Sequence, residues 1–143
     1  MTTIAGRRID FGLWTLRLVT ATGLVVDAAI HLQLAHLYQL VAPGGIGQGN
    51  LFRLEAVVAI ISAILLVLLG NRLSFAIAFV VAASALIAVV LYRYVDVGAI
   101  GPIPSMYEPL WFTKKTVTAI AEALAAITAA TGLFKIRQSG RPA

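Results

Sequence analysis

Asp27 and His31 are the residues of this chain whose types and spacing most directly suggest chemistry. They lie four residues apart in VVDAAIHLQLAHLYQL (25–40), where most other residues are apolar. Four residues of an α-helix correspond to about 40° of rotation, so both side chains would share one face. Ionisable groups inside a membrane segment are costly and are usually paired or functional. The two could act as an acid–base pair, hold a ligand, or join two helices by hydrogen bonds.

The same helix face should collect further polar residues. At about 100° per residue, Thr20 and Tyr38 lie about 20° from Asp27, and Arg17 lies at about 80°. His36 lies about 180° from Asp27 and is therefore excluded from this stripe. Both histidines of the chain are on one helix. Haem ligation by two histidines is therefore not expected in a monomer, and a haem would need another kind of ligand or two subunits.

Two glutamates from other helices are expected at a matching depth. Glu122 should lie about 9–13 Å below the outer end of the last helix, as His31 does in the first helix, and Glu55 should open the second helix near that surface. A single metal ion held by Asp27, His31 and Glu122 is one hypothesis, since carboxylate and imidazole ligands suit zinc, iron or manganese. Together with Tyr38 and Glu55, these residues form the predicted ligand-binding or proton-relay site.

The composition indicates an integral membrane protein. The 143 residues are 60% hydrophobic and 12% charged, with a mean hydropathy of +0.94, whereas soluble domains have roughly 25% charged residues. The net charge of +5 comes from basic residues at predicted helix ends, where they would lie beside a bilayer. Nucleic-acid binding is therefore not predicted. The absence of cysteine excludes disulfides, thiolate metal sites and thiol nucleophiles.

Hydropathy predicts an all-α protein, an integral membrane four-helix transmembrane bundle that forms one domain over residues 1–143. A spanning helix needs about 20 mostly apolar residues, and four segments qualify, at about 11–40, 54–69, 73–92 and 113–134. A Gly-rich linker (41–50) and a Pro-rich linker (97–109) separate them. The expected location is the cell membrane, with multiple passes through the lipid bilayer.

Four spans would place both ends of the chain on one side of the membrane. Basic residues concentrate in cytoplasmic segments, which favours both ends in the cytoplasm (N-in, C-in). Six basic residues are expected on the side of the two ends, namely Arg7, Arg8, Arg72, Lys135, Arg137 and Arg141. Four are expected on the other side, namely Arg53, Arg93, Lys114 and Lys115.

The segment after the third helix is the predicted contact surface for partners. Residues 97–112 would cover the polar site as a lid, with aromatic residues anchored at the interface. The residues expected to make loop or partner contacts are Arg93, Asp96, Tyr107, Glu108 and Trp111.

Several stretches also resemble a set of small proteins. DAAIHLQLAHLY, GQGNLFRLEAVVAI, RYVDVGAIGPIPSMYEPLWF and AIAEALA are similar to segments of small uncharacterised four-helix membrane proteins of high-GC actinobacteria. The resemblance runs from about residue 20 to 130 and is most specific at 92–112. It implies the four-helix fold and a place in the cell envelope, and it implies no activity.

Three functional hypotheses follow from these residues. The first is a module that binds or translocates a cation, a proton or a small polar ligand. The second is a non-catalytic accessory subunit of a larger membrane complex that docks through residues 97–112. The third is an intramembrane enzyme, for which Asp27 and His31 would be the acid–base pair. Assembly as a homo-oligomer is open in each case.

Overall fold

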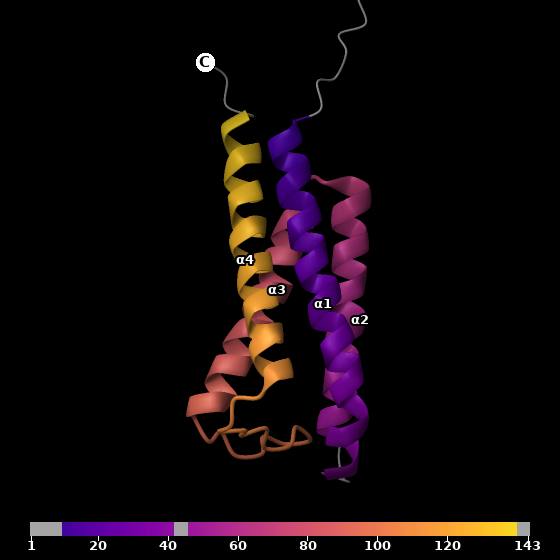
Figure 1. Cartoon of the computed structure of the whole chain (residues 1–143), viewed down its shortest axis with the longest axis vertical. Helices are drawn as coiled ribbons and strands as arrows, with labels where there is room; N and C mark the ends of the chain where they lie inside the picture. The colour runs from indigo at the N-terminus through magenta and orange to yellow at the C-terminus, as the bar shows by residue number, and fades with distance from the viewer. Residues whose placement is uncertain (1–9, 42–45, 140–143) are drawn as a thin grey trace, which may run out of the picture.

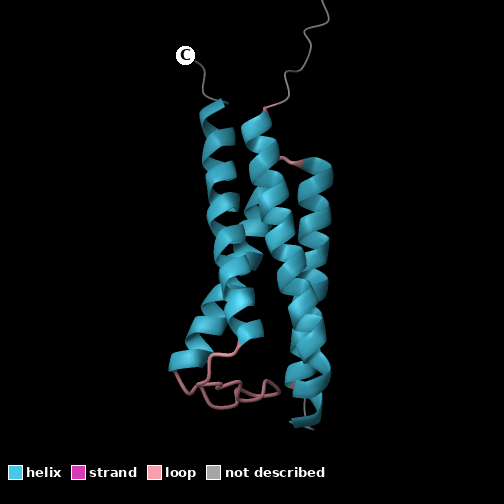
Figure 2. Ribbon diagram, viewed as in Figure 1, coloured by secondary structure: helices cyan, strands magenta, loops and turns pink. Residues whose placement is uncertain are grey.

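The computed structural model describes residues 10–41 and 46–139, which form four helices (Figure 2). They are α1 (Phe11–Val41), α2 (Gln48–Leu69), α3 (Arg72–Tyr94) and α4 (Thr113–Ser139). Each of them is long and apolar enough to cross a membrane. The prediction of an all-α transmembrane bundle with four helices is confirmed.

The second helix begins earlier than its apolar run predicts, at Gln48 rather than near residue 54. Gly47 adopts φ 70° just before the helix, and its carbonyl accepts the N–H groups of Asn50 (3.1 Å) and Leu51 (3.3 Å). The Asn50 side chain also donates to the carbonyl of Ile46 (2.8 Å). These hydrogen bonds give partners to the polar groups at the start of α2, so the helix can begin inside the predicted Gly-rich linker. Residues 42–45 of that linker lie outside the described residues.

The bundle has α1 and α3 on opposite corners. Helix α1 packs along α2 and α4, α3 packs mainly on α4, and α1 meets α3 only slightly. Figure 1 shows the start of α1 and the end of α4 at one end of the bundle, with the α3–α4 loop at the other. The start of α1 and the end of α4 therefore lie at the same end of the bundle, which agrees with an even number of spans. Arg7, Arg8 and Arg141, which weigh in the predicted orientation, lie outside the described residues.

Small residues bring the helices close together. The buried core is dominated by alanines, with Leu24, Leu66 and Phe75 as its largest fully buried apolar side chains. A Cβ on Gly23 would lie 2.8 Å from the carbonyl oxygen of Ala121 on α4, so only glycine permits this approach. Close contact through small residues is how membrane helices gain van der Waals packing. Most of the other large apolar side chains are exposed on the outside of the bundle, as contact with lipid requires.

Arg17 satisfies the end of α2. Its Nε donates to the carbonyl of Leu66 (2.6 Å) and its Nη2 to that of Val67 (2.5 Å), while the guanidinium lies 4.5 Å from the centre of the Trp14 ring. The Leu66 carbonyl also accepts the N–H of Gly70 (3.0 Å). The last carbonyls of a helix otherwise lack partners within it, and a cation is favourable there. Arg17 is therefore a cap for a neighbouring helix rather than a member of the Asp27 stripe.

Asp10 provides a pH-dependent contact between the two ends of the chain. Its carboxylate accepts the N–H of Leu13 (3.1 Å) at the start of α1 and bonds to Lys135 Nζ (2.6 Å). The hydrogen bond from Lys135, followed by that from Leu13, lowers the pKa of Asp10 below its usual value of 3.8. A lowered carboxyl pKa stabilises the fold above the unfolded-state pKa, and this contribution is lost as the pH falls through the folded-state pKa.

We expect Asp10→Asn, which keeps a capping oxygen, to lower the thermal midpoint slightly at neutral pH. The effect should be small because the ion pair is exposed to solvent. Thermal unfolding at neutral pH and near pH 2 checks this, since protonation should remove the difference between variant and wild type. An equal difference at both pH values would mean that the charge of Asp10 is not the cause.

Candidate functional site

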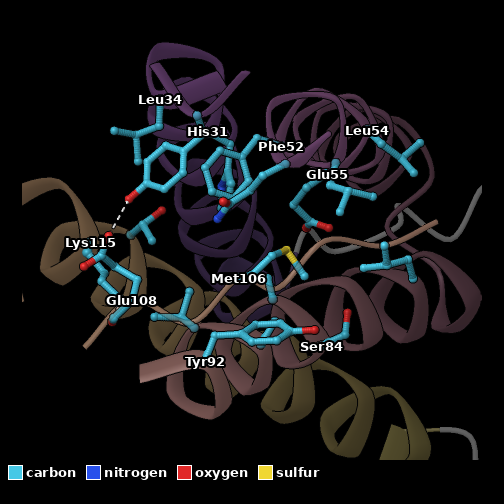
Figure 3. A pocket seen from close by; sticks show the side chains of 18 of the residues that line it. His31, Leu34, Phe52, Leu54, Glu55, Ser84, Tyr92, Met106, Glu108 and Lys115 are labelled. Atoms are coloured by element: carbon cyan, nitrogen blue, oxygen red, sulfur yellow. Dashed lines mark hydrogen bonds between the residues drawn. The ribbon is translucent and has the colours of Figure 1, made fainter. Parts of the chain in front are cut away.

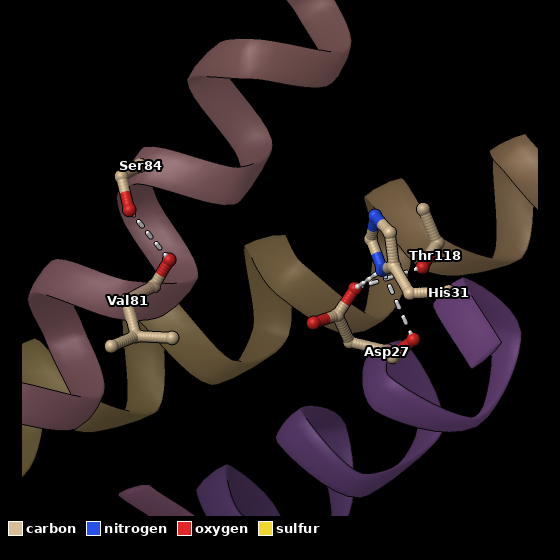
Figure 4. Close-up of polar contacts among 5 residues, drawn as sticks. All are labelled: Asp27, His31, Val81, Ser84 and Thr118. Atoms are coloured by element: carbon tan, nitrogen blue, oxygen red, sulfur yellow. Dashed lines mark hydrogen bonds and ion pairs between the residues drawn. The ribbon is translucent and has the colours of Figure 1, made fainter. Parts of the chain in front are cut away.

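Four polar residues of α1 and α4 meet in the interior of the bundle, and we call them the Asp27 cluster: Asp27, His31, Thr118 and Glu122. Asp27 and Glu122 are each 1% exposed. His31 Nδ1 lies 2.7 Å from Asp27 Oδ1, and the Thr118 hydroxyl donates to the same oxygen over 3.0 Å. Figure 4 shows both contacts converging on the Asp27 carboxylate. Asp27 and His31 therefore lie close together, as predicted. The same oxygen, Asp27 Oδ1, contacts both His31 and Thr118.

Glu122 is the unsatisfied member of this cluster. Both of its carboxyl oxygens are buried and have no hydrogen-bond partner among the described residues. One ligand atom each from Asp27, His31 and Glu122 lies within 4.8 Å of the others. Two carboxyl groups this close in a buried site require a proton or a cation between them. The arrangement can therefore hold either one.

A cavity of about 380 Å³ adjoins the cluster at the loop end of the bundle. All four helices and the α3–α4 loop contribute to its walls, which are mainly apolar (Figure 3). His31 and Thr118 belong to both the cavity wall and the Asp27 cluster, whereas Asp27 and Glu122 do not line the cavity. The two carboxyl groups therefore lie behind the cavity wall, and His31 and Thr118 connect them to it.

Phe52 is a cavity residue that the sequence did not identify. Its ring makes edge-to-face contacts with His31 and Tyr38, with centroids 5.1 and 5.0 Å apart. Phe52 lies between the predicted linker (41–50) and the predicted second helix, which was expected to begin near residue 54. Its position three residues before Glu55 places both on one helix face, and this is the signal that could have identified it.

Glu55 lines the cavity from α2 (Figure 3). It lies two turns into the helix rather than at its opening, because α2 begins at Gln48. Its Oε1 is buried without a hydrogen-bond partner among the described residues. A ligand in the cavity could therefore donate a hydrogen bond to this oxygen.

Glu108 ties the α3–α4 loop to the helices around the cavity. Its N–H donates to the carbonyl of Tyr92 at 3.0 Å, and its backbone carbonyl accepts from Lys115 Nζ at 2.5 Å. Its carboxylate Oε2 accepts from the Tyr38 hydroxyl at 3.3 Å. Predicted as a loop or partner contact, Glu108 is placed by the structure in the cavity wall, where it joins α1, α3 and α4.

The other predicted loop residues lie at the bundle end and do not line the cavity within the described part of the chain. Arg93 lies over Tyr94, 4.9 Å from its ring centre, and 6.0 Å from that of Trp111. Tyr107 and Trp111 are 42% and 43% exposed, and Asp96 is exposed. Such rings and cations are typical of a membrane interface.

We expect Tyr38→Phe to loosen the loop over the cavity. One partly buried hydrogen bond contributes about 1 kcal/mol, which corresponds to about a fivefold increase in local opening. Hydrogen exchange of peptides covering 97–112 measures this, with Tyr94→Phe, at a 66% exposed position, as the matched control. Unchanged exchange in Tyr38→Phe would show that the bond to Glu108 does not hold the loop.

The likeness to small actinobacterial membrane proteins stays a prediction. Comparison with known protein families, curated proteins and solved structures found no match to this chain.

Proposed function

We propose that this multi-pass membrane protein binds a small, mainly apolar ligand in the cavity beneath the α3–α4 loop. The observation that supports this is the position of a cavity of about 380 Å³ directly beside the buried Asp27 cluster. Ligand sites are commonly hollows of roughly 300–1,000 Å³ with apolar walls and a few placed polar groups. This cavity has the same character.

The wall residues indicate the chemistry of the ligand. Phe52, Met106 and Phe112 offer apolar surface, while Lys115 and Glu55 offer a donor and an acceptor on different helices. A ligand with an apolar body and a polar group at one end would match both. His31, in the wall and bonded to Asp27, is suited to exchange a proton with that polar group.

The remainder of the bundle favours binding over translocation. Toward the chain ends, the interior is filled by the buried core, which includes Leu24, Ala125 and Phe75. A translocation path for a cation or a proton would need ionisable groups through this region. The buried polar side chains there include Thr20 and Ser74, which are hydroxyls bonded to Thr128 (2.7 Å) and to the carbonyl of Asn71 (2.9 Å). We therefore propose a binding site that opens at one end only.

We further propose that the cavity end faces away from the cytoplasm. The basis is the sequence count of six basic residues against four, with the chain ends cytoplasmic. Because the chain has no cysteine, Gly98→Cys introduces a unique thiol at a position with nothing within 4 Å. A membrane-impermeant maleimide should label it in intact cells. Labelling only after the cells are opened would reverse the orientation.

Filling the cavity tests the proposed function. Ala88 lines the cavity, so Ala88→Phe should occupy the space of the ligand, whereas its neighbour Ile87 is 64% exposed and Ile87→Phe is the matched control. Native mass spectrometry of protein taken directly from membranes should show an added small-molecule mass in wild type and in Ile87→Phe. A wild-type protein without an added mass, or the same added mass in Ala88→Phe as in wild type, would contradict the proposal.

A second candidate function is docking to a larger membrane complex. Ile100 and Leu110 in the α3–α4 loop are 62% and 68% exposed, which favours a partner surface there. Leu110→Asp should then abolish co-purification of a partner and leave the added small-molecule mass unchanged. Ala88→Phe should have the opposite pattern, so the two functions are distinguishable.

A further inference from the structure

We propose that Asp27, His31 and Glu122 bind one divalent transition-metal ion, with zinc as the best match. This site adjoins the cavity proposed above for a small ligand and shares His31 with the cavity wall. No step of the argument requires that ligand.

The first observation is the unsatisfied Glu122 carboxyl group. It is 1% exposed, and neither oxygen has a hydrogen-bond partner among the described residues. An unpaired buried carboxylate is strongly unfavourable, and such groups are normally paired or coordinate a metal. A metal ion at this position would coordinate one of these oxygens and neutralise the charge of the carboxylate.

The second observation is the convergence of ligand atoms from two helices. The three ligand atoms lie within 4.8 Å of one another, and His31 Nδ1 is 2.7 Å from Asp27 Oδ1. Zinc holds N and O ligands at about 2.0–2.2 Å, so ligand atoms in a tetrahedral site lie roughly 3.4 Å apart. Binding would lengthen the contact of 2.7 Å between His31 and Asp27 and shorten any separation above about 3.4 Å, which side-chain rotation would have to supply. The ion would then bridge α1 and α4.

Charge and ligand type favour a divalent transition metal. Two carboxylates and a neutral imidazole would make an uncharged site with a divalent cation, which suits a buried position. Magnesium and calcium prefer sets of six or more oxygens, whereas a nitrogen with two carboxylates suits zinc. The Thr118 hydroxyl, which donates to Asp27 (3.0 Å), would orient that ligand as supporting groups do in metal sites.

Three protein ligands would leave a fourth zinc position open. His31 and Thr118 line the cavity, whereas Asp27 and Glu122 lie behind its wall. The open position would therefore be reached from the cavity.

The test is metal binding by the full chain. Protein treated with a chelator is incubated with Zn²⁺, desalted and assayed by elemental mass spectrometry. We expect one zinc per chain in wild type and at least a tenfold loss of affinity in Asp27→Asn and Glu122→Gln. The control Glu108→Gln changes a carboxyl group of the cavity wall outside the cluster and should keep full zinc binding.

Cobalt provides a readout that does not depend on the variants folding. Co²⁺ bound in wild type should show the absorption bands of a four-coordinate site, and Zn²⁺ should displace it. If wild type binds no stoichiometric zinc and shows no such bands, the proposal is wrong. A proton shared by Asp27 and Glu122 would then explain how the two carboxyl groups lie so close together. Full zinc binding in both Asp27→Asn and Glu122→Gln would also overturn the proposal. Zinc binding without an added small-molecule mass would contradict only the ligand cavity.

Discussion

Asp27→Ala should lower the free energy of unfolding by about 2 kcal/mol, because it leaves the buried Thr118 hydroxyl without its acceptor and leaves His31 Nδ1 with only the backbone carbonyl of residue 27 (3.2 Å). His31 Nδ1 loses a contact of 2.7 Å, and the Thr118 hydroxyl loses one of 3.0 Å. A buried polar group left unsatisfied costs about 1–3 kcal/mol. Reversible unfolding of the purified protein in detergent or bicelles measures the loss.

A double-mutant cycle isolates the contact between α1 and α4. Thr118→Val removes the hydroxyl at nearly constant volume, and its effect should be smaller once Asp27 is alanine, with a coupling of about 1 kcal/mol. Ser62→Ala is a control, because this buried hydroxyl bonds only within α2, to the carbonyl of Val58 (2.7 Å). If Asp27→Ala is as stable as wild type, the cluster does not hold the helices together.

Gly49→Ala should also destabilise the protein, by about 2 kcal/mol, through a clash between α1 and α2. An added Cβ would lie 2.2 Å from the carbonyl oxygen of Ala35 and 2.8 Å from the Cβ of Gln39. Overpacking costs about 1–3 kcal/mol or more, which exceeds the gain of up to about 1 kcal/mol from replacing a helical glycine. The thermal midpoint of folding measures the change.

Gly98→Ala is the matched control for this substitution. A Cβ there would meet nothing within 4 Å, so the thermal midpoint should stay close to that of wild type. If Gly49→Ala and Gly98→Ala have the same stability, the close approach of α1 and α2 does not depend on glycine at residue 49.

The four helices and the proximity of Asp27, His31 and Glu122 could be predicted because both follow from regular helix geometry. Apolar runs identify spanning segments, and helical rotation places Asp27 and His31 on one face. The number of residues between each side chain and the outer end of its helix places Glu122 at the same depth as His31. Each of these inferences uses only positions along a helix.

The contacts that the sequence did not reveal depend on irregular backbone. Phe52 was missed because α2 starts inside a Gly-rich segment, at Gln48. Glu108 reaches the cavity wall through a loop that has no periodicity to predict its path. The partners of Arg17 are the main-chain carbonyls of Leu66 and Val67. Every residue has a main-chain carbonyl, so the residue types in the sequence do not predict this contact.

The bond from Arg17 to the end of α2 has a consequence for biogenesis. Helix α1 is less apolar than α2 and α3. A helix with an arginine and an aspartate partitions poorly into lipid by itself. We therefore expect α2 and α3 to leave the translocon as a self-sufficient hairpin. Full insertion of α1 would wait until the carbonyls of α2 are present to receive its guanidinium.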